Sequence, residues 1–325
     1  MSGAGGPLVD IVTLSDGEQR KFRQGGNAVR LARGIYIPTD TWRTLDRRSR
    51  AVARIVAAGR TAPTLMVAGK SAAVIHGMPL PGYDDTHDIE LAGCGATSGR
   101  RSTRGFRYRN IPPAHQLLVE TVSTRFGPVH VSPPSMAGLD VARWHDLAAG
   151  VRCLDHALAT GLTTREDIER VIQVGNRVTG VGTMREAGRL ATPWSQSPRE
   201  SDLKVALWRA GLPPPQQQVM LFDADGVFLA RLDFFWPEIG FGVEYDGQGK
   251  FTGEFGVPVE VSARQDMERQ HRIVNLGVLL FRVDRSTYLD GSAVAGIVGM
   301  HGRVAERGIP LAPAFWRGGG LAWTP

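Results

Sequence analysis

Cysteine is scarce in this sequence, and long apolar runs are missing from it. The two cysteines, Cys94 and Cys153, are too far apart for a CxxC pair and suggest no disulfide framework, so a reducing compartment is expected. No run approaches the roughly 20 apolar residues of a membrane span. The first residues, MSGAGGPLVD, lack the basic and apolar regions of a signal peptide. We therefore expect a cytoplasmic protein without a membrane segment.

The signatures of common cofactor sites are also absent. The eight histidines are scattered, with neither an HExxH motif nor a Cys/His cluster, so no zinc site is expected. Gly69-Lys70-Ser71 resembles the end of a phosphate loop, but that motif needs glycine at position 64, where Thr64 stands. We instead expect residues 69–77 to belong to a helix.

Positive charge exceeds negative charge. The formal net charge is +6 and the isoelectric point is about 9.7, which favours a polyanionic partner such as DNA. Nearly all basic residues are arginine, a bias that a GC-rich genome also produces, so charge alone does not decide the partner. Lysine occurs four times, which makes the position of Lys250 noticeable.

The length of 325 residues and the apolar content of 42% predict a folded protein of two or three domains. Residues 15–24 predict a short helix with a Ser15/Glu18 capping box, and residues 29–38 alternate like a small basic hairpin. A helix before a basic hairpin indicates a winged-helix remnant, and an exposed basic edge is the alternative. Residues 46–60 predict an amphipathic helix.

Short strands alternate with turns from about residue 86 to residue 132. This region holds the densest basic cluster of the chain, here called the arginine patch: Arg100, Arg101, Arg104, Arg107 and Arg109. Arg101, Arg104 and Arg107 are candidates for contacts with DNA phosphates, and a solvated loop and strand edge is the alternative. Helices are expected at 136–160 and 163–173, with a connecting segment at 176–197.

Three stretches of the first half form a recognisable set. They are Arg30 to Ile37, Ala68 to Pro79, and Val131-Ser132-Pro133-Pro134 leading into Leu139 to Arg143. This set resembles the AbiEi-type antitoxin proteins common in actinobacteria, over roughly residues 20–175. The resemblance implies an N-terminal winged helix, shortened here, followed by an α/β region.

The last third of the chain predicts elements in the order α-β-β-β-α-β. Its first helix has Ser197 as N-cap, Pro198 at the first position and Glu200 closing a capping box. The expected elements after it are strands at 217–222 and 227–236 around the turn 223–226, a strand through 241–247, a helix at 264–276 and a buried strand at 278–283.

Carboxylates lie within two of these strands, among apolar residues. The strands read Arg231-Leu232-Asp233-Phe234-Phe235-Trp236 and Phe241-Gly242-Val243-Glu244-Tyr245-Asp246-Gly247. A period of two places Glu244 and Asp246 on one face, and Asp233 could project beside them from the preceding strand. Buried carboxylates without a fixed cation are costly, and a divalent metal is the usual remedy.

The order of elements and these acidic residues resemble the PD-(D/E)XK nucleases, in the branch related to the very-short-patch repair endonucleases. The resemblance covers about residues 194–290. It assigns the family's helix-borne Glu to Glu200, its strand Asp to Asp233, its E-x-D-G to Glu244, Asp246 and Gly247, and its D-x-x-R helix to Asp266 and Arg269. Asp246 replaces the lysine that the fold carries two places after its Glu, and relatives often have His where Lys250 stands.

This resemblance implies hydrolysis of phosphodiester bonds with Mg²⁺, or Mn²⁺, as the cofactor. Asp233 and Glu244 would hold the ion, together with the carbonyl of Tyr245. Asp246 could hold a second ion or orient water, and Lys250 could stabilise the attacking hydroxide or the phosphate of the transition state.

Arg264, Arg269 and Arg272 share a helix face and could grip backbone phosphates. Each candidate also has a structural alternative. Asp233 could pair with Arg231 or Arg282, Glu244 could be an ion-pair partner, Asp246-Gly247 could be a turn, Lys250 could be a solvated loop residue, and Glu200 could be a cap.

The whole sequence predicts an α/β protein in three parts. They are a truncated winged-helix-like segment at 1–45, an AbiEi-like α/β domain at 46–192 and a PD-(D/E)XK nuclease-like domain at 193–325. The expected function is a Mg²⁺-dependent DNA endonuclease in phage defence or in a toxin–antitoxin system, with DNA and a toxin or antitoxin protein as candidate partners. The alternative is a non-catalytic DNA-binding antitoxin or transcriptional regulator that uses a degenerate nuclease fold.

Overall fold

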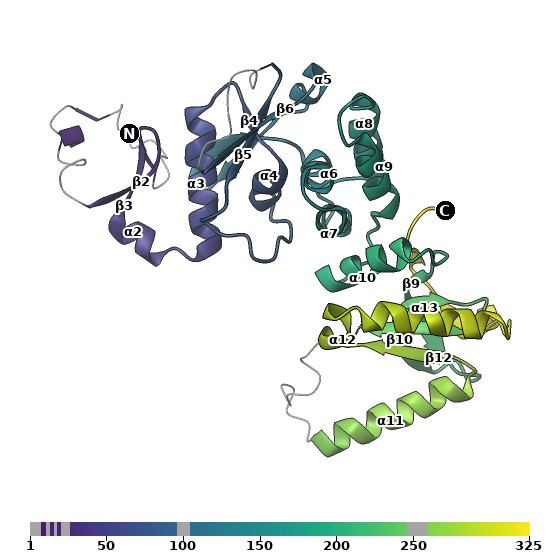
Figure 1. Cartoon of the computed structure of the whole chain (residues 1–325). Helices are drawn as coiled ribbons and strands as arrows, with labels where there is room; N and C mark the ends of the chain where they lie inside the picture. The colour runs from purple at the N-terminus through teal and green to yellow at the C-terminus, as the bar shows by residue number, and fades with distance from the viewer. Residues whose placement is uncertain (1–7, 11–13, 16–17, 21–26, 96–104, 246–258) are drawn as a thin grey trace. The chain divides into compact units, whose positions relative to one another are not determined.

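The computed structural model describes residues 8–10, 14–15, 18–20, 27–95, 105–245 and 259–325, with the backbone alone at 259–266. Helices and strands are mixed along the chain, so the protein is α/β, as expected. The chain forms two compact units, Met1–Gly188 and Arg189–Pro325 (Figure 1). Residues 1–45 therefore belong to the first unit.

A small antiparallel sheet opens the first unit, in the strand order β1-β3-β2. Its strands are β1 (Val9–Asp10), β2 (Ala28–Ala32) and β3 (Ile35–Pro38). The hairpin expected at 29–38 is confirmed, and Gly34, with φ +78°, lies in its turn. Helices α2 (Thr39–Thr44) and α3 (Arg47–Thr61) follow, and Ile35 and Ile37 join the apolar core of α3.

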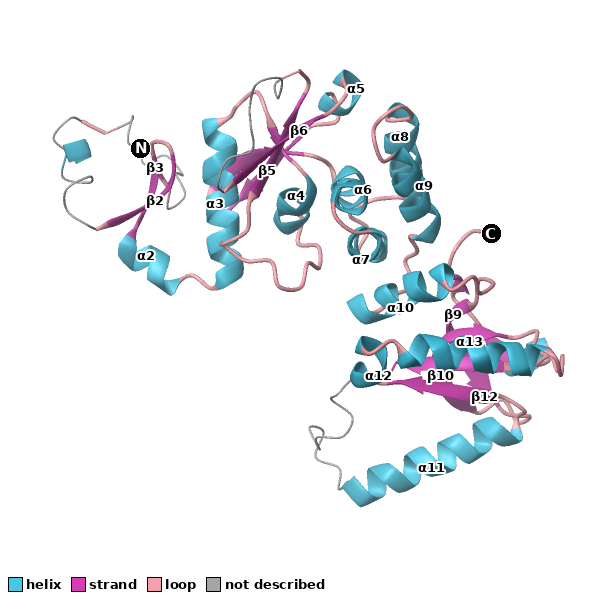
Figure 2. Cartoon of the chain, viewed as in Figure 1, coloured by secondary structure: helices cyan, strands magenta, loops and turns pink. Residues whose placement is uncertain are grey.

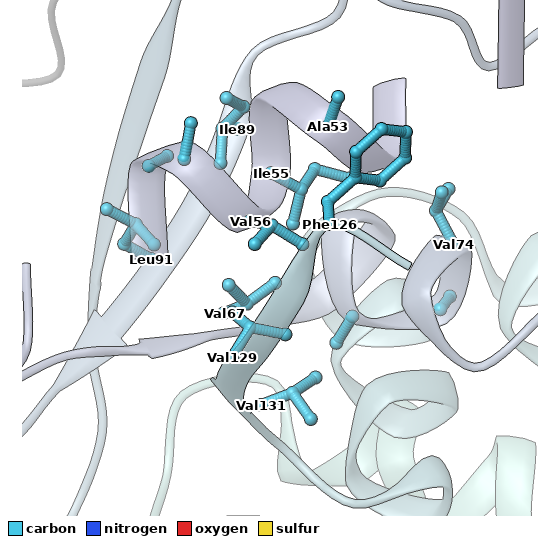
Figure 3. Close-up of a cluster of buried hydrophobic side chains, with 14 of the residues drawn as sticks. Ala53, Ile55, Val56, Val67, Val74, Ile89, Leu91, Phe126, Val129 and Val131 are labelled. Carbon is cyan, nitrogen blue, oxygen red and sulfur yellow. The ribbon is translucent and has the colours of Figure 1, made fainter. Parts of the chain in front are cut away.

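A five-stranded sheet forms the centre of the first unit, in the order β6-β5-β4-β8-β7. Its strands are β4 (Met66–Val67), β5 (Ile89–Gly93), β6 (Phe106–Asn110), β7 (Glu120–Thr124) and β8 (Gly127–Val131). The pairs β5–β6 and β4–β8 are parallel, and the other two pairs are antiparallel. Figure 3 shows the core at this sheet, where Ile55 and Val56 of α3 lie with Val67, Val129 and Phe126.

The helices of the first unit correct two expectations. They are α4 (Gly69–Ile75), α5 (Pro113–Gln116), α6 (Pro134–Trp144), α7 (Leu147–Ala159), α8 (Arg165–Val174) and α9 (Val181–Leu190). The single helix expected at 136–160 is wrong, because Asp146 accepts the Ala149 N–H at 2.9 Å and so starts a new helix. The connecting segment expected at 176–197 contains α9, which buries Met184, Ala187 and Leu190.

The second unit has the expected order α-β-β-β-α-β. The elements are α10 (Pro198–Arg209), β9 (Gln216–Phe222), β10 (Phe228–Trp236), β11 (Phe241–Tyr245), α11 (Val259–Asn275) and β12 (Leu279–Val283). The sheet order is β12-β11-β10-β9, with β11–β12 parallel and the other two pairs antiparallel. In Figure 2 these strands lie between α10 and α11.

The end of the chain adds elements that the sequence did not predict. They are α12 (Arg285–Leu289), α13 (Ser292–Ala305), the 3-10 turn η3 (Pro313–Phe315), and strands β13 (Trp316–Arg317) and β14 (Gly320–Leu321), which both pair with β9. This addition covers the outer side of β9, so the two edges of the sheet described here are β12 on one side and the short strands β13 and β14 on the other.

Two packing expectations in the second unit are wrong. Strand β12, expected to be buried, is an edge strand in which Val283 alone is fully buried. The sequence of the helix expected at 264–276 offers four apolar residues for packing, Met267, Ile273, Val274 and Leu276. Of these, Met267 and Val274 are exposed, while Ile273 is buried in the core. Among the described residues, no helix is both long enough and apolar enough to cross a membrane.

Candidate functional site

Four polar side chains follow one row across strands β9 to β12: Gln218, Asp233, Glu244 and Arg282. Asp233 and Glu244 stand one position beyond the last paired residues of β10 and β11, so they face each other across neighbouring strands. Gln218 lies opposite Asp233 on the other side, between two positions that remain paired. Arg282 is the partner of Glu244 in the parallel pair. The candidate site is this row.

Asp233 is held by neutral donors. Its Oδ2 accepts the Tyr245 N–H at 2.7 Å, and its Oδ1 lies 3.4 Å from Nε2 of Gln218. Burial, followed by the charge of Glu200, raises the pKa of Asp233 to about 7, and Glu244 adds to the rise. The carboxyl therefore sits in an environment that disfavours its own charge.

Glu200 reaches the same row from the first turn of α10. Its Oε2 accepts the Gln196 N–H at 2.8 Å and the Nε2 of Gln218 at 2.9 Å. Ser197 is the N-cap, as expected, and its hydroxyl accepts the Glu200 N–H at 3.2 Å, while the carboxylate of Glu200 accepts the backbone N–H of Gln196, one residue before the N-cap. Burial raises the pKa of Glu200 as well.

Glu244 has the opposite surroundings. Arg269 of α11 donates to both of its oxygens, at 3.1 and 3.3 Å, and Nε of Arg282 lies 3.8 Å away. Glu244 is 4% exposed, and these two guanidinium groups offset its charge. The ion-pair alternative for Glu244 is thus present in the structure.

The row is therefore electrostatically divided. Glu200 and Asp233 form no ion pair with any residue that the structure describes, whereas Glu244 has two arginine partners. Arg231 donates to Oε1 of Gln196 at 2.7 Å, and its charge acts to lower the pKa of Glu200 without reversing the rise that burial causes. Uncompensated negative charge is concentrated at Glu200 and Asp233.

The donor chemistry of this row fits Mg²⁺. That ion prefers oxygen ligands and needs one or two carboxylates, with water or phosphate completing its shell. Besides the carboxylates, Oε1 of Gln218 is a buried oxygen without a hydrogen-bond partner among the described residues. No three His, Cys, Asp or Glu residues within the described ranges form a complete metal cluster. Of the residues present, Asp233 and Glu244 would hold the ion.

Several expected site residues contribute no geometry. Four of them lie outside the described residues: Asp246, Lys250, Arg101 and Arg104. The side chain of Arg264 lies outside them as well.

Three arginines expected to contact phosphate form ion pairs within the protein. Arg269 binds Glu244, Arg272 binds Asp223 at 2.6 Å, and Arg107 binds Asp88 at 2.9 Å. Asp223 lies in the β9–β10 turn and Asp88 just before β5, so both partners come from strand ends that the sequence did not place near these arginines. Tyr245 contributes its N–H to Asp233, and its ring packs edge-to-face on Tyr288 at 6.0 Å.

A second buried carboxylate, Glu90 in β5, was not identified from the sequence. It is 2% exposed, and it accepts the Lys70 N–H at 2.8 Å, the His145 Nε2 at 3.0 Å and the Arg109 guanidinium at 3.1 Å. Burial raises the pKa of Glu90, but His145, the Lys70 N–H and Arg109 outweigh it, so the pKa is lowered overall. Its lone pairs are satisfied, and it ties α4 and the end of α6 to the neighbouring strands β5 and β6. The alternation of Glu90 with Asp88, opposite Arg107 and Arg109, was the available signal.

No model of a known protein family matches this chain. The chain is similar to an uncharacterized protein of Mycobacterium tuberculosis, in strains CDC 1551 / Oshkosh and ATCC 25618 / H37Rv, with 27% identity over 113 residues. The match covers 35% of this chain and 41% of the relative, so the chain spans less than half the length of the proteins that it matches.

Proposed function

We propose that the second unit is a Mg²⁺-dependent endonuclease that hydrolyses phosphodiester bonds of DNA, on a PD-(D/E)XK-like core. The observation that carries this proposal is the position of Asp233 opposite Glu244, with Glu200 reaching the same row. Asp233 and Glu200 lack a cation partner among the described residues, and burial raises the pKa of both. A divalent cation would offset their charge.

When bound, Mg²⁺ would neutralise charge on the phosphate and activate a water molecule. Asp233 and Glu244 would each offer a carboxylate oxygen, and Arg269 and Arg282 would orient Glu244. Asp246 and Lys250, which follow Glu244 in the sequence, are the candidates for orienting water and for stabilising the charge that develops on the phosphate. Glu200 would keep the negative potential high beside Asp233.

For the first unit we propose a DNA-binding role in an AbiEi-like arrangement, with the hairpin β2–β3 as a winged-helix remnant. Its support is the resemblance together with the net charge of +6. Phage defence or a toxin–antitoxin system in the cytoplasm is the setting that we propose, with a toxin or antitoxin protein as a second partner.

A non-catalytic DNA-binding antitoxin or regulator is the second candidate. It is favoured by the two arginines at Glu244, because they neutralise one of the two expected metal ligands without a metal. In that case the row would be a structural remnant of a nuclease site.

Plasmid nicking with Mg²⁺ or Mn²⁺, combined with calorimetry of metal binding, separates the two candidates. We expect the wild-type protein to bind the ion and nick the plasmid. Asp233→Ala and Glu244→Ala should each abolish nicking while the protein stays folded, because each removes a ligand. Asp225→Ala, in the exposed β9–β10 turn, is the matched control and should nick normally. A wild type that binds neither ion and does not nick the plasmid would support the non-catalytic candidate. Variants that nick at the normal rate would instead show that Asp233 and Glu244 are not the metal ligands of the nuclease site.

A further inference from the structure

Gln218 has an unusual backbone for its position. Its φ is +51°, and no other non-glycine residue that the structure describes has a positive φ. It lies inside strand β9, where Gln217 and Val219 on either side keep their pairing with β10. The left-handed region is costly for a residue with a Cβ atom. Such a conformation persists when its surroundings enforce it, and it often marks a functional position.

The side chain of Gln218 joins two acidic groups from different elements. It is 9% exposed, and its Nε2 lies 2.9 Å from Oε2 of Glu200 and 3.4 Å from Oδ1 of Asp233. The same amide leaves Oε1 buried and without a hydrogen-bond partner among the described residues. A buried unpaired oxygen is costly. The amide nitrogen therefore has both carboxyls as acceptors, while the amide oxygen, Oε1, has no donor among the described residues.

An amide has an effect here that a charged side chain would not have. An arginine at this position would neutralise Glu200 and Asp233, as Arg269 and Arg282 do for Glu244. The amide N–H groups hold the two carboxyls side by side without cancelling their charge. Glu200 from α10 and Asp233 from β10 therefore both lie beside the same amide nitrogen, Nε2 of Gln218, at this end of the row.

We propose that Gln218 is a positioning residue that holds Glu200 and Asp233 together for a divalent cation. The left-handed backbone directs the amide to both carboxyls, and its donated hydrogen bonds fix their orientation. This inference rests on the proposed function, because the cation is the one that the endonuclease would use. The general precedent is that groups which orient metal ligands matter nearly as much as the ligands.

Two variants separate positioning from a purely structural role in the strand. Gln218→Gly relieves the strained φ and removes the amide, whereas Gln218→Met keeps the length of the side chain and removes the amide alone. If Gln218 were only a strand residue, Gln218→Gly would melt at least as high as the wild type and bind metal as well. Gln216→Met, two residues before Gln218 in the same strand, is the matched control.

The test uses the full chain, with calorimetry of Mg²⁺ and Mn²⁺ binding. We expect both Gln218 variants to stay folded and to bind either ion about 10- to 100-fold more weakly, the usual effect of losing a group that orients a ligand. In plasmid nicking, kcat should fall while KM for DNA stays unchanged, because Gln218 is buried beside the carboxyls. Gln216→Met should match the wild type in each measurement.

Nuclear magnetic resonance gives a readout that is independent of activity. The side-chain amide signal of Gln218, identified by its loss in Gln218→Met, should exchange slowly with solvent and shift when Mg²⁺ is added to the wild type. Unchanged metal affinity in both variants would overturn the positioning role and leave the endonuclease proposal standing. A wild type that binds neither ion would overturn the endonuclease proposal, and this inference with it.

Discussion

Asp233 and Glu244 face each other across two strands, yet their charge environments are opposite. Glu244 is neutralised by Arg269 and Arg282, whereas Asp233 accepts hydrogen bonds from neutral groups and lies beside Glu200. The same kind of side chain therefore has opposite effects on stability at two adjacent positions. Removing the charge at each position separately tests this difference.

Removing the charge of Asp233 should stabilise the metal-free protein above neutral pH. Its folded pKa of about 7 lies above the value near 4 of an unfolded aspartate. The protonated carboxyl therefore adds to the free energy of unfolding, fully below about pH 4, and this contribution is lost as the pH rises through 7. For one proton, the free energy of unfolding falls by up to about 1.4 kcal/mol per pH unit. Asp233→Asn should melt higher than the wild type at pH 8 in the presence of a chelator.

Thermal unfolding across pH 4 to 8 measures this effect. Asp233→Asn should show a smaller fall in melting temperature over that range than the wild type, and Asp225→Asn should follow the wild type. An equal fall in Asp233→Asn and the wild type would contradict the environment described for Asp233.

Neutralising Glu244 should have the opposite outcome. Glu244→Gln leaves Arg269 and Arg282 without their carboxylate, and both are about three-quarters buried, with 26% of each side chain exposed. Unpairing such groups costs about 1–3 kcal/mol, so the variant should be less stable than the wild type at neutral pH. Chemical denaturation without metal is the measurement. A Glu244→Gln variant that is as stable as the wild type would mean that the arginines find other partners.

At the scale of elements, tertiary contacts outweigh intrinsic propensity in helix α3. Alanine stabilises a helix interior by up to about 1 kcal/mol relative to glycine. Gly59, however, lies where a Cβ atom would be 2.6 Å from Cγ2 of Val129 and 3.4 Å from Cγ2 of Val67. Val129 is buried and β-branched, so it has little freedom to move away. The close packing of α3 on β4 and β8 therefore depends on this glycine.

Gly59→Ala should destabilise the first unit by about 1–3 kcal/mol, the cost of overpacking a core. Gly302→Ala is the matched control, because Gly302 lies in helix α13 with nothing within 4 Å of an added Cβ. That variant should gain up to about 1 kcal/mol. Denaturant titration of both variants checks the pair, and a stabilised Gly59→Ala would show that α3 moves freely on its sheet.

At the scale of the whole molecule, part of the positive charge is used in ion pairs within the protein. Arg107 and Arg109 belong to the arginine patch, but they pair with Asp88 and Glu90 across β5 and β6. The net charge of +6 still favours a polyanion. It follows that the ion pairs of Arg107 and Arg109 should limit their share in the salt dependence of DNA binding.

Replacing Arg101 and Arg104 together by alanine should lower the affinity for DNA and flatten its salt dependence. Each lost phosphate contact reduces the slope of log K against log salt by about 0.9. Arg107→Ala should change the slope less, because its guanidinium is already held by Asp88 at 2.9 Å. Binding titrations at several salt concentrations test both variants. An unchanged slope in the double variant would assign the patch to a solvated edge.

The sequence alone determined the elements whose signals are local. The hairpin at 29–38, the N-cap Ser197 and the order α-β-β-β-α-β follow from alternation, capping residues and turn residues, which act over a few positions. Asp233 and Glu244 were found as neighbours for the same reason, because their strands are consecutive and the period of two fixes their side. Helix α9 was missed because its few apolar residues lie among glycine and arginine, where the local signal is weak.

The tertiary structure decided the partners of the charged groups. Arg269 could have faced phosphate or Glu244, and the packing of α11 on β10 and β12 selects Glu244. Gln218 has no sequence signal for its left-handed backbone, which arises where β9 meets the carboxyls of α10 and β10. Pairing across elements depends on which of several compact arrangements buries the most apolar surface, and that choice is made by the whole chain.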